Sequence, residues 1–83
     1  MKHASTATLR QIEALLAELR ALPGLKEKSV GAFYRAGSAF LHFHEDPAGL
    51  FVDIKVDGDW MRRPVNNETA RAKLVRDARR LLA

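Results

Sequence analysis

The chain has 83 residues, of which 47% are hydrophobic and 29% are charged, with a formal net charge of +4 and no cysteine. A chain of this length forms one domain, and without cysteine it has neither disulfides nor thiolate zinc sites. No stretch approaches the roughly 18 apolar residues that cross a membrane, and residues 1–6 lack the apolar run of a secretory signal. We therefore expect one cytoplasmic domain over residues 1–83 that has no membrane partner.

A helix is expected at each end of the chain. The first shows apolar residues at spacings of three and four and ends at Leu22-Pro23-Gly24, where proline and glycine stop it. Thr6 or Thr8 is expected to cap its start. The second follows Asn66 or Asn67, which suit a helix cap, and repeats the same apolar spacing to the end of the chain. Each helix thus has one apolar stripe to bury against a sheet.

The middle of the chain has the alternation of strands, which we expect over residues 30–36, 39–45, 50–56 and 59–63. Turn residues separate them at Gly37-Ser38, at Asp46-Pro47-Ala48-Gly49 and at Asp57-Gly58. The charged segment Lys26–Ser29 is expected to be a loop, and Pro64 favours an edge position for the last strand. The order α-β-β-β-β-α predicts an α+β fold, an antiparallel three- or four-stranded meander with N- and C-terminal helices.

Alternation along the strands sorts the side chains onto two faces of the expected sheet. Pairing Glu45 with Leu50 places Phe43 opposite Val52 on an apolar face that suits the helices, and Tyr34 is expected on the same side. The other face combines aromatic, basic and histidine side chains and is the expected ligand or partner face. Its residues are Phe33, Arg35, Phe40, His42, His44, Phe51, Asp53, Lys55, Trp60 and Arg62.

Two explanations compete for so many rings on one sheet face. A helix or a second subunit can cover the face, since large apolar patches on small proteins usually meet protein. A ligand site also explains it, because rings mixed with polar groups are typical of ligand sites. The leading hypothesis is a small non-enzymatic binding or interaction domain that uses this aromatic and basic face. We expect it to form a homodimer and to bind an unidentified ligand or protein.

His42 and His44 are alternate residues of one expected strand, and Asp53 lies beside them on the next, so these three are the candidate metal ligands. His3 and Glu45 are further contributors that the chain offers, whereas nearby basic residues oppose a cation. A His42–Asp53 pair that only orders the sheet explains the same residues. No nucleophile elbow, glycine-rich phosphate loop or Ser-His-Asp pattern accompanies them. We assign no metal, no cofactor and no catalytic residue, and favour a protein that is not an enzyme.

Basic residues concentrate toward the end of the sequence, with seven basic and two acidic residues from Arg62 onward. The last helix carries Lys73, Arg76, Arg79 and Arg80 on one outer arc. Such an arc is usually a solvated helix face, but it can also lie against phosphates. The alternative function is therefore a nucleic-acid-associated protein that binds through this helix, although no helix-turn-helix, zinc-finger or RNP signature is present.

Two segments, ALPGLKEK and FYRAGSAFLHFHEDPAGLFVDIKV, resemble short bacterial proteins of unknown function, most clearly in AFLHFHEDPAGLF. More distantly they are similar to the MmcQ/YjbR-like group, at Leu22-Pro23-Gly24, Gly37, Phe40 and Lys55. The matching positions mark turns rather than chemistry, and they lie in about half of the chain. The resemblance implies a helix-flanked antiparallel sheet in a cytoplasmic protein. It also implies DNA binding, which is proposed for that group, without defined catalytic residues.

Overall fold

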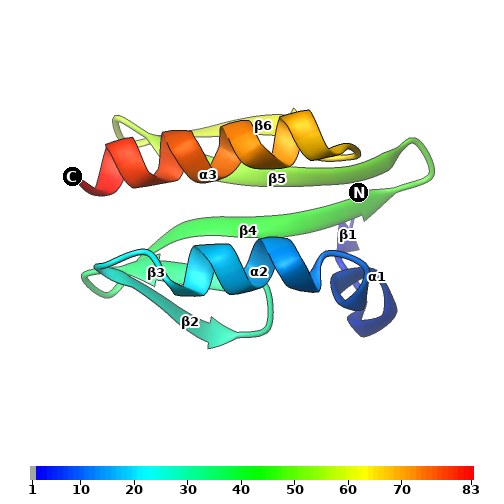
Figure 1. Cartoon of the computed structure of the whole chain (residues 1–83), viewed down its shortest axis with the longest axis horizontal. Coiled ribbons are helices and arrows are strands. Elements are labelled where there is room, and N and C mark those ends of the chain that lie inside the picture. The colour runs from blue at the N-terminus through cyan, green and yellow to red at the C-terminus, as the bar shows by residue number, and fades with distance from the viewer. Residues whose placement is uncertain (1) are drawn as a thin grey trace.

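A computed structural model describes residues 2–83 as one antiparallel sheet with helices on one of its faces (Figure 1). The helices are α1 (Thr6–Arg10), α2 (Glu13–Arg20) and α3 (Glu68–Leu82). The strands are β1 (Lys2–His3), β2 (Leu25–Ser29), β3 (Ala32–Arg35), β4 (Ser38–Asp46), β5 (Gly49–Val56) and β6 (Asp59–Pro64). The expected α+β class is confirmed, but the expected strand number is wrong. The meander has five strands in the order β2-β3-β4-β5-β6, and β1 adds a sixth, which pairs with His44 and Glu45 of β4 beyond the part of β4 that pairs with β3.

The expected N-terminal helix is divided into α1 and α2 by a break at Ile12, whose backbone leaves the helical region (φ −116°, ψ 28°). Ser5 caps α1, because its hydroxyl accepts the N–H of Thr8 at 3.2 Å, so a cap at Thr6 or Thr8 was wrong. Leu9, in α1, and Ile12, at the break itself, are both buried. The break therefore turns α1 while keeping the apolar stripe of the segment on the core.

The charged segment expected to be a loop, Lys26–Ser29, forms most of the edge strand β2. Glu27 faces the helix side, where it pairs with Arg20 of α2 and accepts the N–H of Gly31 at 2.9 Å. Burial would raise the pKa of Glu27, but these bonds outweigh it and lower the pKa. Charged side chains are common on edge strands, because they prevent pairing with another chain. The missing apolar alternation is the reason that the sequence concealed this strand.

The predicted register between β4 and β5 is found, with Glu45 opposite Leu50 and Phe43 opposite Val52. The apolar side chains of this face meet those of α2 and α3 in one core. The largest fully buried side chains are Phe33, Ile12, Leu16, Leu19, Leu41, Ile54, Leu74, Val52 and Val65. Asn67, one of the two residues expected to cap the last helix, caps α3 by accepting a hydrogen bond from the N–H of Ala70 at 2.8 Å.

A β-bulge at Phe40 corrects the predicted positions of two phenylalanines. β3 pairs Phe33 with Leu41 and Tyr34 with Ala39, so Phe40 is an extra residue on β4 without a partner on β3. An extra residue reverses the alternation of faces beyond it. Phe33 (1% exposed) and Phe40 therefore lie in the core, and their expected place on the ligand face was wrong.

The same bulge exchanges the faces of Tyr34 and Arg35. Arg35 donates from Nη1 to the carbonyl of Leu81 in α3 at 2.8 Å, so it lies on the helix side and not on the expected ligand face. Tyr34 pairs with Ala39 on the opposite face, and both line a pocket that also includes His42. Without the bulge, the alternation used for the sequence prediction would have held.

None of the helices within residues 2–83 has the length and apolar character needed to cross a membrane.

Candidate functional site: the open face of the sheet

The face of the sheet opposite α2 and α3 is called the open face here, since no helix of residues 2–83 covers it (Figure 1). Seven of the ten residues predicted for a ligand face remain there after the correction at the bulge. The β4–β5 and β5–β6 registers place them side by side, with Asp53 opposite Arg62 and Lys55 opposite Trp60. These seven residues are His42, His44, Phe51, Asp53, Lys55, Trp60 and Arg62.

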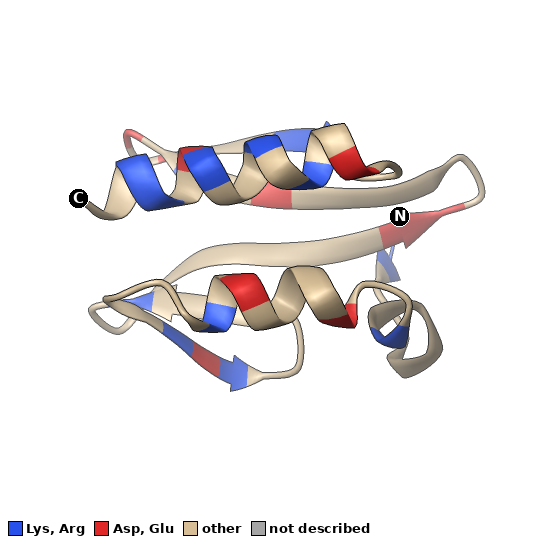
Figure 2. Cartoon of the chain, viewed as in Figure 1, with Lys and Arg blue, Asp and Glu red and all other residues tan. Residues whose placement is uncertain are grey.

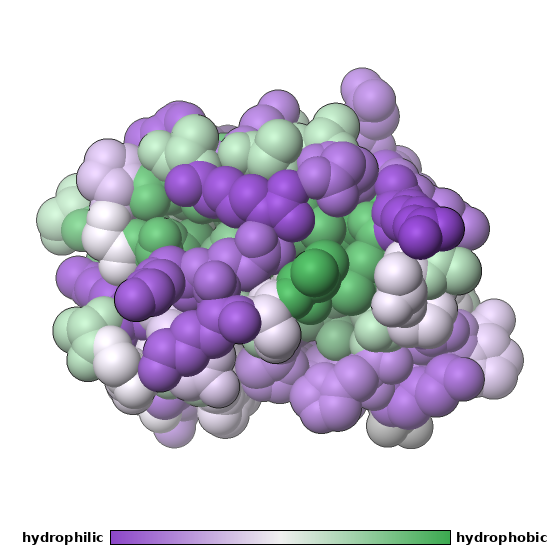
Figure 3. All heavy atoms as spheres, turned by 90° about the horizontal axis from the view of Figure 1, so that it is seen from below, coloured by the Kyte–Doolittle hydropathy of each residue, from purple (hydrophilic) through white to green (hydrophobic). Residues whose placement is uncertain are grey.

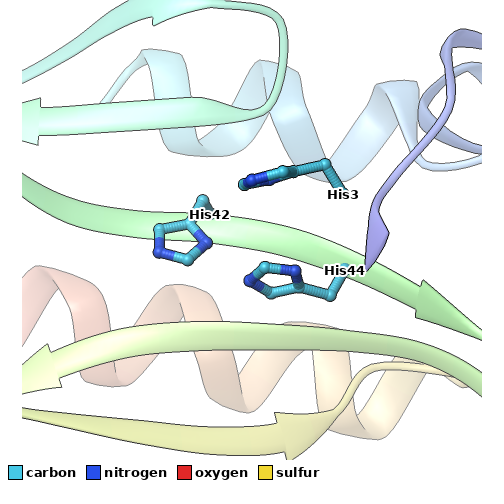
Figure 4. Close-up of side chains that lie close together, drawn as sticks. All are labelled: His3, His42 and His44. Atoms are coloured by element: carbon cyan, nitrogen blue, oxygen red, sulfur yellow. The ribbon is translucent and has the colours of Figure 1, made fainter. Parts of the chain in front are cut away.

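The three histidines of the chain meet on the open face (Figure 4). His42 and His44 are alternate residues of β4, and β1 pairs His3 directly with His44. The ring centroids of His42 and His44 are 4.7 Å apart, those of His3 and His44 5.0 Å, and those of His3 and His42 5.9 Å. One nitrogen from each ring can be chosen so that all three lie within 4.8 Å of one another.

Several nitrogens of this histidine cluster are buried and have no hydrogen-bond partner among the described residues, 2–83. They are Nδ1 of His42 and both nitrogens of His44, a residue that is only 9% exposed. His44 Nε2 lies 3.0 Å from Oδ2 of Asp53, but the two groups are not aligned as a hydrogen bond. Buried polar atoms in folded proteins are almost always paired. These nitrogens are therefore the unsatisfied polar groups of the open face.

Burial, followed by the neighbouring His44, lowers the pKa of His42, although the carboxylate of Asp53 acts in the opposite direction. The His42 ring is accordingly neutral at neutral pH and keeps a lone pair on one nitrogen. A neutral imidazole with a free lone pair is the form that accepts a hydrogen bond or binds a metal ion.

Asp53 is buried (7% exposed) and lies between His44 and Arg62. Arg62 donates from Nε to Oδ1 at 2.7 Å and from Nη2 to Oδ2 at 2.8 Å. This two-bond pair holds the pKa of the Asp53 carboxyl below its ordinary value, against the effect of burial. His42 is the residue opposite Asp53 in the ladder, as predicted, but the close contact of Asp53 is with His44.

Two rings on the open face are accompanied by lysines. Lys28 Nζ lies 4.5 Å from the ring centroid of Tyr34, and Lys55 Nζ lies 4.9 Å from that of Trp60. Trp60 is 43% exposed, and its ring centroid is 4.8 Å from that of His42. The sequence prediction included Trp60 and Lys55 but missed the pair formed by Lys28 of β2 and Tyr34 of β3, because it placed Tyr34 on the helix side.

A pocket of about 440 Å³ lies where β1, α1 and the β2–β3 turn approach β4. His3 and His42 belong to its lining, together with apolar residues such as Leu9 and Phe43. Figure 3 is viewed from the side of β2 and α1 and shows an apolar area near the middle of this side, between hydrophilic side chains. Val30 in the β2–β3 turn is 59% exposed. The histidine cluster therefore borders an opening and is not sealed in the protein.

Basic positions recur along α3 on the other side of the sheet (Figure 2). Lys73, Arg76, Arg79 and Arg80 are all exposed, as their predicted outer arc requires. Arg76 and Arg80 share Asp77 at 3.4 Å and 3.9 Å, so part of their charge is already compensated.

Asp77 also joins α3 to β6, because Arg63 donates to it at 2.9 Å. This bond lowers the pKa of Asp77, against the effect of burial. A carboxyl group with a lowered pKa stabilises the folded state above its unfolded pKa, near 3.9, and loses this contribution as the pH falls through the folded pKa. We therefore expect Asp77→Asn to be less stable than the wild type at pH 7 and equally stable near pH 2. Urea denaturation at both pH values measures this, and a gap that persists at pH 2 would contradict it.

Sequence reasoning named His3 only as a further contributor and placed no strand at the start of the chain. β1 is two residues long, which is too short for an alternation pattern to reveal it. Its position is fixed by contacts with β4, where the N–H of Ala4 donates to the carbonyl of Phe43 at 3.2 Å. Glu45 accepts the N–H of Ser5, so this predicted contributor serves the start of α1.

Comparison of the chain with protein-family models, curated proteins and solved structures gave no match. The resemblance to the MmcQ/YjbR-like group therefore stays a prediction.

Proposed function

We propose that this protein is a small non-enzymatic binding domain whose open face binds single-stranded nucleic acid. The observation that carries the proposal is the pairing of rings with cations, Tyr34 with Lys28 and Trp60 with Lys55. Proteins that bind single strands combine aromatic side chains, on which bases stack, with positive charges along the phosphate backbone. The open face offers both kinds of group.

The two ring–lysine pairs are far enough apart to meet different bases of one strand. Tyr34 lies on β3 and Trp60 on β6, with β4 and β5 between them. Three strand spacings correspond to about 14 Å across the sheet. A strand crossing the sheet from β3 to β6 would pass beside His42, whose ring centroid is 4.8 Å from that of Trp60, and would reach this second ring.

The charge of the open face favours an anionic partner. Asp53 is already neutralised by Arg62, and within residues 2–83 neither Lys28 nor Lys55 forms an ion pair. Two copies packed face to face would bring like charges together, which is unfavourable at an interface. The homodimer expected from the sequence stays a prediction, and a dimer would more readily use another surface.

Fluorescence anisotropy with a labelled single-stranded oligothymidine tests the proposal. Stacking of one base on an aromatic side chain contributes about 1–3 kcal/mol, so Trp60→Ala should weaken binding by roughly 5- to 150-fold. Met61→Ala is the matched control, because Met61 is also exposed (54%) but pairs with Ile54 on the helix side. Equal affinities for Trp60→Ala and the wild type, with Met61→Ala unchanged, would refute binding through the open face.

The exposed cations of α3 favour a second candidate, nucleic-acid binding through that helix. Binding through α3 should depend steeply on salt concentration. A variant that reverses three charges, Arg76→Glu, Arg79→Glu and Arg80→Glu, should then abolish it. The same oligothymidine decides between the two surfaces. Loss of binding in the α3 variant together with full binding by Trp60→Ala would assign the function to α3.

A further inference from the structure

The histidine cluster has the composition and spacing of a metal site. All three histidines of the chain belong to it, and they come from two strands that are distant in the sequence. Imidazole is a preferred ligand of zinc, copper and nickel ions. Two nitrogens bound to one tetrahedral zinc ion are about 3.3 Å apart, given bond lengths near 2.0–2.1 Å. Nitrogens that already lie within 4.8 Å of one another need to approach by at most about 1.5 Å to reach this separation.

The unpaired nitrogens are an independent observation that points to a ligand. Nδ1 of His42 and both nitrogens of His44 are buried and have no hydrogen-bond partner among residues 2–83. The desolvation cost of such groups is offset only when something binds them. A metal ion would satisfy a lone pair from each ring at once.

The charges near the cluster permit a cation. The sequence suggested that Arg62 and Lys55 would oppose one, but Arg62 is bound through two nitrogens to Asp53, so this pair is neutral overall. The ammonium group of Lys55 is held near the ring of Trp60. The nearest carboxylate to the cluster, that of Asp53, is 3.0 Å from His44.

We propose that His3, His42 and His44 bind a divalent first-row transition-metal ion of the Zn²⁺ type on the open face. Asp53 is a positioning residue in this site: a small rotation of the His44 ring would align its Nε2–H with Oδ2, 3.0 Å away, and would leave Nδ1 of that ring for the ion. Carboxylates commonly orient metal-binding histidines in this way. The ligand set therefore differs from the one suggested by the sequence, with His3 in the place of Asp53.

Three protein ligands leave one coordination position open. His3 is exposed, and the cluster borders the pocket beside the β2–β3 turn, so water or an anion can reach that position. Three neutral imidazoles leave the ion with its full positive charge. An occupied site would therefore add to the positive charge of the open face. Metal binding by the three histidines does not depend on whether the face binds nucleic acid.

Cobalt and zinc titrations test the site on tag-free protein that has been dialysed against a chelator. One Co²⁺ per chain should give the visible absorption bands of a four-coordinate ion, and Zn²⁺ should displace it. His42→Ala and His3→Ala should each weaken binding by at least roughly 100-fold, since only two of three ligands remain. His3 is exposed, so we expect His3→Ala to leave the fold intact even if His42→Ala does not.

Lys55→Ala is the control that separates this proposal from nucleic-acid binding. It should weaken oligothymidine binding and leave the affinity for Co²⁺ unchanged. Asp53→Asn should lower the affinity for Zn²⁺ by roughly 10- to 100-fold and shift the Co²⁺ bands, as expected for a positioning residue. Absence of a stoichiometric Co²⁺ complex, or equal affinity in His3→Ala and the wild type, would overturn the metal site. Either result would leave the proposal for nucleic acid standing.

Discussion

Replacing Phe33 with alanine is expected to lower the free energy of unfolding by about 3–5 kcal/mol, the usual cost of removing a buried phenylalanine ring. Phe33 is 1% exposed and belongs to the core beneath the helices, because the bulge at Phe40 turns it away from the open face. The cost is large for a domain of this size, whose total stability is of the order of 5 kcal/mol. The variant should therefore be largely unfolded at 37 °C. Chemical denaturation followed by circular dichroism measures the change.

Phe51→Ala is the matched control for this experiment. Phe51 is also a strand phenylalanine, but it lies on the open face opposite His44 and is only partly buried. Its replacement should cost less, since the ring removes less apolar area from water and the space that it leaves lies on the open face instead of forming a cavity in the core. Similar costs for the two variants would contradict the bulge, because an unbulged hairpin places both rings on the open face.

The hairpin from β4 to β5 could be predicted in detail from the sequence. Gly49 has a backbone conformation (φ +135°) that other residues rarely adopt, and the alternation from Leu50 to Val56 is regular. Together they fix the register, and the register places His42 and His44 on one face. This part of the candidate site follows from local rules alone.

The hairpin from β3 to β4 could not be predicted in the same way. Its turn is Ala36-Gly37, one residue earlier than expected, and the bulge at Phe40 has no local sequence signal. Phe40 and Leu41 are adjacent apolar residues, and burying both is possible only when the alternation is interrupted. The free energy gained by burying Phe33 and Phe40 in the core favours the bulge. This gain depends on helices that are distant in the sequence, so local patterns do not reveal it.

The third histidine was beyond the reach of pattern analysis for a related reason. His3 joins the cluster because β1 pairs with the part of β4 that β3 leaves free. A strand of two residues has no periodicity of its own, so its place depends on the vacant edge of its neighbour. Sequence reasoning therefore predicted two of the three proposed ligands and missed the element that carries the third.

The proposed metal site links β1 to β4, so a bound ion should stabilise the folded state. A ligand that binds only the folded state stabilises it by about 2.7 kcal/mol when its free concentration is 100 times the dissociation constant. For a domain of this length, that corresponds to a rise of roughly 10–20 °C in the melting temperature. We therefore expect Zn²⁺ at this concentration to raise the melting temperature of the wild-type protein by this amount.

His3→Ala should melt near the temperature of the metal-free wild type and respond little to Zn²⁺, because it loses the ligand that β1 contributes. Thermal scans with Zn²⁺, with Mg²⁺ and with a chelator separate coordination by imidazole from a general effect of divalent charge, since Mg²⁺ prefers oxygen ligands. Hydrogen exchange of the Ala4 amide, which donates to Phe43 of β4, should slow when Zn²⁺ is present. A rise in melting temperature of the same size in His3→Ala would show that Zn²⁺ acts elsewhere on the chain and that β1 takes no part in binding it.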